Sequence, residues 1–394
     1  MEGGLLLKER LVVVEEGERS LRWGVIWEEV KKLSILAAPM VAVGVAQYLL
    51  QVISLMMVGH LGEISLSSAA LATSLTGVTG FILLTGMASG LETLCGQAYG
   101  AHQYQNLGLN TQKAISVSSW LGNVGAALAI SLSTWFGAAI LGLYVQYSPS
   151  CERTRLRLSR GVFKGLEFLR LAIPSAIMIC LEYWSFELLI LLSVLLPNAK
   201  LETSVLSICL TSSTLLYNIP NGLGAAASTR VSNELGAGKP QVARLATYAA
   251  MLVSITETVI VGTTLFATRY ILGCAYSSEK EVVSYVANMV PLLCLSVITD
   301  GIQAVLSGVA RGCGWQHIGA YINLGAFYLF GIPIAAILGF ELHLGGKGLW
   351  IGIVCGSTIQ ATLLALITIL TNWQQQATRA RARVFKEGLS TMGI

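Results

Sequence analysis

The chain has 394 residues, of which 54% are apolar and only 12% are charged, and its formal net charge is +4. Such a composition cannot cover a water-facing surface of this size, so it places much of the surface in a lipid bilayer. The positive charge does not indicate nucleic acid, because the cations fall in loops between apolar blocks. The eight cysteines contain no Cys-x-x-Cys pair, so neither a zinc site nor a disulfide framework is predicted.

Residues 1–32 are charged throughout and lack the apolar core and cleavage site of a secretory signal, so we expect a cytosolic tail. Nine apolar blocks follow, each exceeding the length of about 18 residues that a membrane helix needs. The predicted spans are, in chain order, Leu33–Val58, Leu66–Leu91, Ser119–Tyr147, Leu171–Leu196, Ser204–Thr229, Leu245–Thr268, Val282–Ala310, Ile318–Phe340 and Leu349–Thr371.

Lys and Arg gather in the N-terminal tail, in residues 151–170, in residues 230–244 and in the C-terminal tail, residues 374–394. Positive charge in short loops marks the cytosolic side. Six spans separate the 151–170 loop from the C-terminal tail, which places both segments on one side, as their charge requires. Only three spans precede the 151–170 loop, and they place it opposite the equally basic N-terminal tail.

The chain also resembles itself at an offset of 135–136 residues, which predicts two homologous lobes. The matched positions pair Leu36–Pro39 with Leu171–Pro174, and Gly86, Thr93, Gly100 and Ala101 with Gly222, Thr229, Gly236 and Ala237. In both copies a helix ends in a small-residue turn, and a polar stretch leads into the next helix.

A second match, between Gly122–Gly125 and Gly345–Gly348, has an offset of 223 residues. The third span therefore resembles the sixth member of its lobe. The two offsets differ by 87 residues, close to the length of three spans with their loops. Loss of an odd number of spans between about Ala114 and Leu121 also explains the charge conflict, so the sequence predicts a first lobe shortened to about three spans.

Four segments together carry a specific family resemblance: Cys95–Ala101 (CGQAYGA), Cys180–Glu187 (CLEYWSFE), Ala227–Gly238 (ASTRVSNELGAG) and Gly308–Gln316 (GVARGCGWQ). The chain resembles the plant-like eukaryotic branch of the multidrug and toxic compound extrusion (MATE) family over roughly Lys31–Trp373. That family has twelve spans in two six-helix lobes, and this sequence departs from it by lacking most of members three to five.

The resemblance implies an all-α polytopic membrane protein with two pseudo-repeated helical lobes. The N-lobe, residues 33–150, is expected to keep about three spans, and the C-lobe, residues 171–373, to have six, with the basic 151–170 loop between them. The resemblance further implies antiport, in which entry of protons or sodium drives export of small organic cations, xenobiotics or secondary metabolites. No enzymatic activity and no cofactor are expected, and the location is a vacuolar or plasma membrane.

Carboxylates inside apolar spans are costly and tend to be functional. Glu182 lies eight residues after Pro174, and Asp300 lies near the middle of its span, so both are expected to face one cavity between helices. A carboxylate there can exchange a proton for a cationic substrate. By resemblance, Glu182 and Asp300 match the acidic positions that couple transport to cations, with Glu187 as a helper.

We expect Tyr183, Trp184, Gln303 and Asn221 to line the substrate pocket, the aromatic rings by stacking on aromatic or cationic substrates. Ordinary packing of these side chains against neighbouring helices is the alternative. Arg311, between two glycines at a cytosolic helix end, is expected to meet lipid phosphate.

Two further acids, Glu257 and Glu92, are expected to serve structure, the first by bonding neighbouring helices and the second at a cytosolic helix end. At the level of function, one alternative is a non-transporting variant that associates with full-length relatives or is degraded. Another is a lipid-linked precursor flippase, which would require a strongly cationic central cavity where this sequence has acids.

Overall fold

A computed structural model of the chain describes residues 2–61, 82–108, 147 and 166–392. These residues form helices and no strand, which confirms the all-α class. The helices are α1 (Glu2–Gly59), α3 (Ile82–Gly100), α6 (Leu166–Ser193), α7 (Ala199–Gly236), α8 (Pro240–Ala267), α9 (Arg269–Tyr276), α10 (Lys280–Cys313), α11 (Gln316–Asn323), the π-helix η4 (Leu324–Gly331), α12 (Ile332–Ala336), the π-helix η5 (Ile337–Glu341), α13 (Gly345–Leu370) and α14 (Trp373–Met392).

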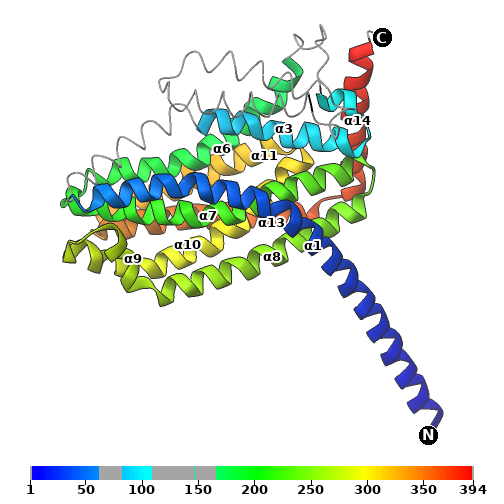
Figure 1. The fold of residues 1–394 in the computed structure, drawn as a ribbon, viewed down its shortest axis with the longest axis horizontal. Coiled ribbons are helices and arrows are strands. Elements are labelled where there is room, and N and C mark those ends of the chain that lie inside the picture. Colours follow the sequence, from blue (N-terminus) through cyan, green and yellow to red (C-terminus); the bar gives the residue numbers. More distant parts are fainter. Residues whose placement is uncertain (1, 62–81, 109–146, 148–165, 393–394) are drawn as a thin grey trace.

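The long helices lie side by side in one bundle, from which the N-terminal part of α1 projects (Figure 1). Six helical segments of the described residues are long and apolar enough to span a membrane: Trp23–Gly59, Leu171–Ser193, Pro240–Ala267, Lys280–Cys313, Gln316–Glu341 and Gly345–Leu370. They coincide with six of the nine predicted spans. Of the predicted span Leu66–Leu91, only the part within α3 is described, and the predicted span Ser119–Tyr147 and the 151–170 loop lie almost wholly outside the described residues.

The predicted span Ser204–Thr229 is helical, within the 38 residues of α7, but it is not among the six apolar segments. The reason is its position. α7 contacts α1, α3, α6, α8, α10, α13 and α14, so other helices cover most of its surface. A helix enclosed by protein does not need an apolar exterior, and its hydroxyl groups bond to its own backbone, as Ser207 does to the carbonyl of Thr203 at 2.6 Å.

The two copies of the sequence repeat make equivalent contacts across the bundle. A Cβ added to Gly86 of α3 would lie 2.6 Å from the Cα of Ala176 in α6, and one added to Gly222 of α7 would lie 3.1 Å from the Cα of Val41 in α1. Gly86 and Gly222 are 136 residues apart, and Val41 and Ala176 are 135 apart. The second helix of each copy therefore packs against the first helix of the other, as a pseudo-twofold axis requires.

The same symmetry holds where α3 and α7 cross. A Cβ on Gly100 would overlap the backbone carbonyl of Asn233, and a Cβ on Gly236 would overlap the backbone carbonyl of Gln97. Each pair of equivalent residues is again separated by 136 positions. The two helices thus meet backbone to backbone at their C-terminal ends, which only glycine permits.

We call the end of the bundle at which residues 230–244 and α14 lie the basic end. At this end Arg230 of α7 binds Glu29 of α1, with its Nε 2.6 Å from Oε1 and its Nη2 3.1 Å from Oε2. At the other end of α1, the His60 ring lies 3.2 Å from the hydroxyl of Ser278. α1 thus starts from the basic end, and residues 2–32 belong to the same continuous helix as the first span.

The C-terminal helix α14 crosses the basic end of the bundle (Figure 1). Its buried apolar side chains share one face at helical spacing: Trp373, Ala377, Ala380 and Val384. The indole nitrogen of Trp315, in the turn after α10, donates to the Gln376 side chain at 3.2 Å. The predicted C-terminal tail is therefore a docked amphipathic helix.

Candidate functional site

Glu182 of α6 is the centre of a polar cluster inside the bundle. Four side chains from four other helices donate to its partly buried carboxylate. The donors are the hydroxyl of Tyr217 (α7) at 3.1 Å, and the amide nitrogens of Gln303 (α10) at 2.8 Å, Gln360 (α13) at 3.2 Å and Asn323 (α11) at 3.5 Å. This convergence fixes the carboxylate in the C-lobe interior.

The amide groups around Glu182 are themselves held in place. Asn323 also donates to the backbone carbonyl of Met178 at 2.7 Å, and Gln360 donates to the Asn323 side-chain oxygen at 2.7 Å. One residue after Asn323, the helix changes from α to the wider π form of η4. Such widened turns often occur at functional sites.

Asp300 lies in the layer next to Glu182. Its carboxylate accepts a hydrogen bond from Ser296 at 2.8 Å and another from Ser357 of α13, and its charge interacts with that of Glu182. α10 and α13 run in the same direction, and the residues that contact Glu182, Gln303 and Gln360, each come three positions later. Asp300 is thus displaced by about 4.5 Å along the helices, away from the basic end.

A buried polar stripe follows one face of α10 from Asp300 to the basic end of the bundle. Its members recur at spacings of three or four residues: Ser296, Asp300, Gln303, Ser307 and Arg311. Gln303 connects the layer of Glu182 to the next turn of α10 through a hydrogen bond of 3.1 Å to the Ser307 hydroxyl. Buried polar side chains at this spacing place Asp300, Gln303 and Arg311 on a single face of one helix.

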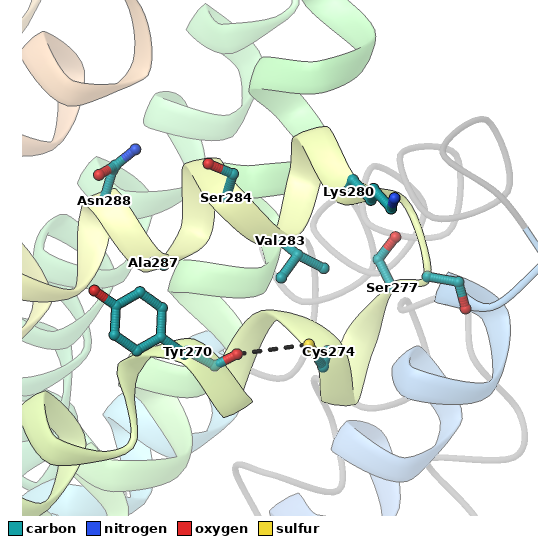
Figure 2. A pocket seen from close by; sticks show the side chains of 9 residues that line it. Tyr270, Cys274, Ser277, Lys280, Val283, Ser284, Ala287 and Asn288 are labelled. Atoms are coloured by element: carbon teal, nitrogen blue, oxygen red, sulfur yellow. Dashed lines mark hydrogen bonds between the residues drawn. The ribbon is translucent and has the colours of Figure 1, made fainter.

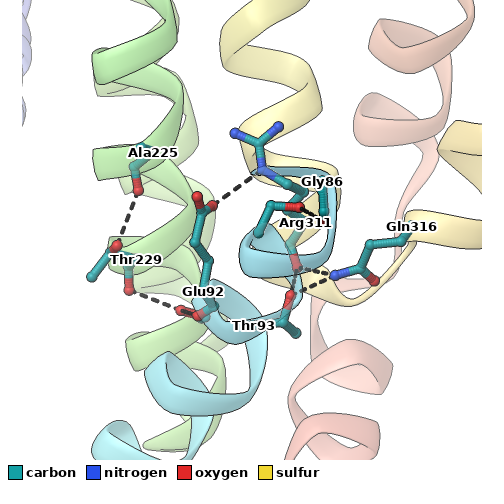
Figure 3. A network of polar contacts seen from close by, with 9 residues as sticks. Gly86, Glu92, Thr93, Ala225, Thr229, Arg311 and Gln316 are labelled. Atoms are coloured by element: carbon teal, nitrogen blue, oxygen red, sulfur yellow. Dashed lines mark hydrogen bonds and ion pairs between the residues drawn. The ribbon is translucent and has the colours of Figure 1, made fainter. Parts of the chain in front are cut away.

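Arg311 is the last residue of the stripe. The sequence led us to expect that it would meet lipid phosphate, but it does not. Its side chain is buried, and its Nε lies 3.1 Å from Oε2 of Glu92 on α3 (Figure 3). The expectation was wrong because sequence position at a helix end does not reveal that α3 covers this end of α10. Glu92, for which only a structural role was expected, belongs to the other lobe and provides the countercharge.

The predicted pocket residues fall at different distances from Glu182. Gln303 contacts it directly. Asn221 is exposed on α7, one turn after Tyr217 and on the same face. Tyr183 follows Glu182 in the chain and therefore points about 100° around α6 from it.

Two other predicted site residues point away from Glu182. Trp184 is 36% exposed and, two residues on, points to nearly the opposite face of α6. Glu187 lies about 140° around α6 from Glu182. The structure therefore gathers Glu182, Asp300 and Gln303 into one cluster, whereas the roles of the other predicted residues stay predictions.

The sequence analysis missed three partners of Glu182, namely Tyr217, Asn323 and Gln360. A signal for two of them was present, because Asn323 and Gln360 are amides in the middle of apolar spans, where an unpaired polar group is costly. The sequence did not show which way the side chains of Asn323 and Gln360 face, because an apolar span has no polar face that would indicate the rotation of the helix.

A cavity of about 510 Å³ lies elsewhere, between α9 and the first turns of α10, at the end of the bundle opposite the basic end. Tyr270, Lys280 and Asn288 line it, and the Cys274 thiol donates to the Tyr270 carbonyl at its floor (Figure 2). Asn288 precedes Asp300 by twelve residues, about 18 Å of helix, so this cavity is separate from the Glu182 cluster.

Comparisons with known proteins agree with this geometry. The MatE family model matches residues 39–155 and 174–337. The chain is 46% identical over 460 aligned positions to Protein DETOXIFICATION 14 of Arabidopsis thaliana, with 95% of each protein covered. It is 45% identical over 466 positions to Protein DETOXIFICATION 3 of the same plant, with 96% of this chain and 97% of that protein covered.

The crystal structure of the eukaryotic MATE transporter AtDTX14 matches with a TM-score of 0.83 and 46% identity, covering 91% of this chain and 99% of that one. The family model matches a stretch in each half of the chain, residues 39–155 and 174–337, and the structural match covers 91% of the chain. The chain therefore belongs to the MATE family, whose members are membrane transporters rather than enzymes and move organic substrates by coupling to ions, without a cofactor.

Proposed function

We propose that this chain is a secondary active antiporter that exports organic cations, xenobiotics or secondary metabolites across a vacuolar or plasma membrane in exchange for protons. The observation that carries the proposal is the convergence of four side-chain donors on Glu182. In the proposed cycle, Glu182 and Asp300 bind the organic cation when ionised and release it when protonated, and the two lobes alternate between open states.

The direction of the amide groups favours protons over sodium as the coupling ion. Gln303, Asn323 and Gln360 present N–H groups to Glu182, and these groups stabilise a carboxylate but repel a metal cation. A sodium site would need carbonyl oxygens in those positions. A proton needs no such cage, because it binds to one carboxylate oxygen and only one or two donors must adjust.

The energy of a proton gradient is sufficient for such an exchange. One charge crossing 100 mV contributes about 2.3 kcal/mol, and each unit of pH difference contributes about 1.4 kcal/mol. Exchange of one proton for one monovalent cation moves no net charge, so the pH difference alone drives it, and each pH unit concentrates the cation about tenfold. The membrane potential contributes when more than one proton enters for each cation. The proposal therefore requires no nucleotide.

The test is uptake of a fluorescent organic cation into proteoliposomes, driven by an imposed pH gradient. Glu182→Gln and Asp300→Asn are each expected to lower the initial rate by at least about tenfold, since neither amide can release a proton. Glu281→Gln is the matched control. It removes an exposed carboxylate from the end of α10 opposite the basic end, and its uptake rate should stay within about twofold of the parent.

A sodium gradient imposed without a pH gradient serves as the second arm. Uptake driven by sodium and not by pH would contradict proton coupling. Full uptake by both carboxylate variants would contradict the assignment of Glu182 and Asp300. Either result would leave the family membership unchanged.

A second candidate function is a non-transporting variant that associates with full-length relatives. It is favoured by the alignment to Protein DETOXIFICATION 14, whose 460 positions exceed the 394 residues of this chain by 66. Likewise, the first stretch that the MatE model matches, residues 39–155, is shorter than the second, residues 174–337. Both observations support a shortened first lobe. Absence of uptake from correctly inserted protein, together with co-purification with a co-expressed full-length relative, would favour this second candidate.

A further inference from the structure

The C-terminal end of α10 is held by α3, a helix of the other lobe. The backbone carbonyl of Arg311 accepts a hydrogen bond from the Thr93 hydroxyl, which in turn accepts one from the Gln316 amide at 2.6 Å (Figure 3). One turn further along α3, the Gln97 amide donates to the carbonyl of Gly312 at 3.2 Å. These contacts and the Glu92–Arg311 ion pair join the two lobes at the basic end.

The guanidinium of Arg311 connects these inter-lobe contacts with the acid cluster. Arg311 lies on the polar stripe of α10 that contains Asp300 and Gln303, and its Nε contacts Oε2 of Glu92 at 3.1 Å. The polar stripe therefore runs from the acid cluster of the C-lobe to a carboxylate of the other lobe.

The exposure of the two partners shows how the contact can open. The Arg311 side chain is 8% exposed, whereas Glu92 is 28% exposed. Removing one partner of a buried ion pair leaves the other charge buried and uncompensated, which strongly destabilises the closed arrangement of the lobes. Separation of the lobes at the basic end would instead let water reach both groups together, so the closed and open arrangements can each satisfy the charges.

We propose that Glu92 and Arg311 form an inter-lobe latch that holds the basic end of the bundle closed, and that Arg311 is a positioning residue of the transport cycle. The proposal rests on the proposed antiport, because a latch that opens has a use only if the lobes alternate. Hydrogen bonds from Thr93, Gln97 and Gln316 hold the backbone of α10 at the latch. The Glu92–Arg311 ion pair is the contact that water can replace when the lobes separate.

Labelling of Cys313 tests the latch without requiring transport. Cys313 lies two residues after Arg311 and is 1% exposed, so a reagent can reach it only when the packing at the basic end opens. A membrane-impermeant maleimide is applied to vesicles that present the basic end outward, and labelled peptides are identified by mass spectrometry. Arg311→Gln and Glu92→Gln are each expected to speed Cys313 labelling at least about fivefold over the parent.

Three further variants make the test specific. Arg244→Gln removes an exposed arginine that bonds to Tyr248 within its own helix, and it should label like the parent. The charge exchange Glu92→Arg with Arg311→Glu should return labelling to within about twofold of the parent, because the pair is restored. Arg311→Lys, which keeps the charge, should fall between the parent and Arg311→Gln.

Cys209, buried in the core of α7, reports misfolding in the same samples. If Cys209 also becomes labelled in Arg311→Gln, the comparison uses Arg311→Lys instead. Parental labelling rates in both single variants, or failure of the charge exchange to slow labelling, would overturn the latch. If labelling confirms the latch but the same protein shows no uptake, the proposed antiport is contradicted, whereas the inter-lobe contact is still supported.

Discussion

At the scale of single residues, the interior of the C-lobe is organised around one carboxylate. The cost of placing charge in an apolar span made Glu182 and Asp300 predictable from sequence, and Gln303 was predicted as a pocket residue. Which amides would turn toward Glu182 was not predictable, because Asn323 and Gln360 come from spans without a polar face. The partner of Arg311 was also unpredictable, since it lies 219 residues away on α3.

Replacing Gln360 by Leu should weaken both stability and transport. The change removes one donor from a charged acceptor, and such hydrogen bonds are worth about 1.5–3 kcal/mol. We expect a lower Tm in thermal unfolding and slower pH-driven uptake. Thr362→Val is the control, because this exposed hydroxyl on the same helix bonds to the carbonyl of Thr358. A Gln360→Leu variant with parental Tm and uptake would show that the network around Glu182 contributes little.

Glu257 of α8 gives a contrasting prediction. Its Oε2 is buried and has no hydrogen-bond partner among the described residues, and a carboxylate in that position is satisfied best when it carries a proton. A neutral amide imitates that form, so Glu257→Gln should keep uptake within about twofold of the parent and should not lower the Tm. A loss of uptake as large as that expected for Asp300→Asn would instead make Glu257 a third coupling acid.

At the scale of elements, the apolar blocks of the sequence predicted the long helices of the C-lobe, including Ser204–Thr229 within α7. α7 is enclosed by other helices, so its serines and threonines escape the selection that lipid imposes on the outer spans. Neither the π-helical turns η4 and η5 nor the continuity of residues 2–32 with the first span could be read from composition. The internal repeat did predict which helices are equivalent, and the glycine contacts agree with it.

The crossing of α3 and α7 should be intolerant of any side chain. Gly100→Ala and Gly236→Ala each place a methyl group against a backbone carbonyl that cannot rotate away, and overpacking of this kind costs about 1–3 kcal/mol. Both variants should lower the Tm by similar amounts, because their surroundings are equivalent. Gly325→Ala, with open space at the position of its Cβ, should leave the Tm unchanged. Tolerance of alanine at either crossing position would mean that the helices are less closely apposed.

At the scale of the whole molecule, the structure locates the charge conflict of the first lobe. Glu29 binds Arg230 at the basic end, so α1 starts on the side where α14 lies, as the charges of both tails demand. Asn106, after α3, donates to the Val384 carbonyl of α14 at 3.5 Å, and α6 also begins at the basic end. The described residues on either side of 109–165 therefore lie at the same end of the bundle, whereas the sequence predicts one apolar block, Ser119–Tyr147, between them.

Epitope tags can check this arrangement. Tags inserted after Leu107 and before Leu166 should both be reached by antibody from the side that exposes the C-terminal tail. A tag at Leu61, beyond the far end of α1, should be reached only from the other side. Accessibility of the Leu107 and Leu166 tags from opposite sides would restore a single crossing between them and would invert the C-lobe relative to α1.

The crossing of α3 and α7 also constrains how the two halves of the sequence can diverge. Gly100 and Gly236 each touch the main chain of the opposite copy rather than a side chain. A bulkier residue in one copy therefore cannot be compensated by a smaller one in the other, because the opposing group is a backbone carbonyl, which every residue has. Elsewhere a substitution in one half can be matched by a substitution in the other, but at these two positions only glycine fits in either half.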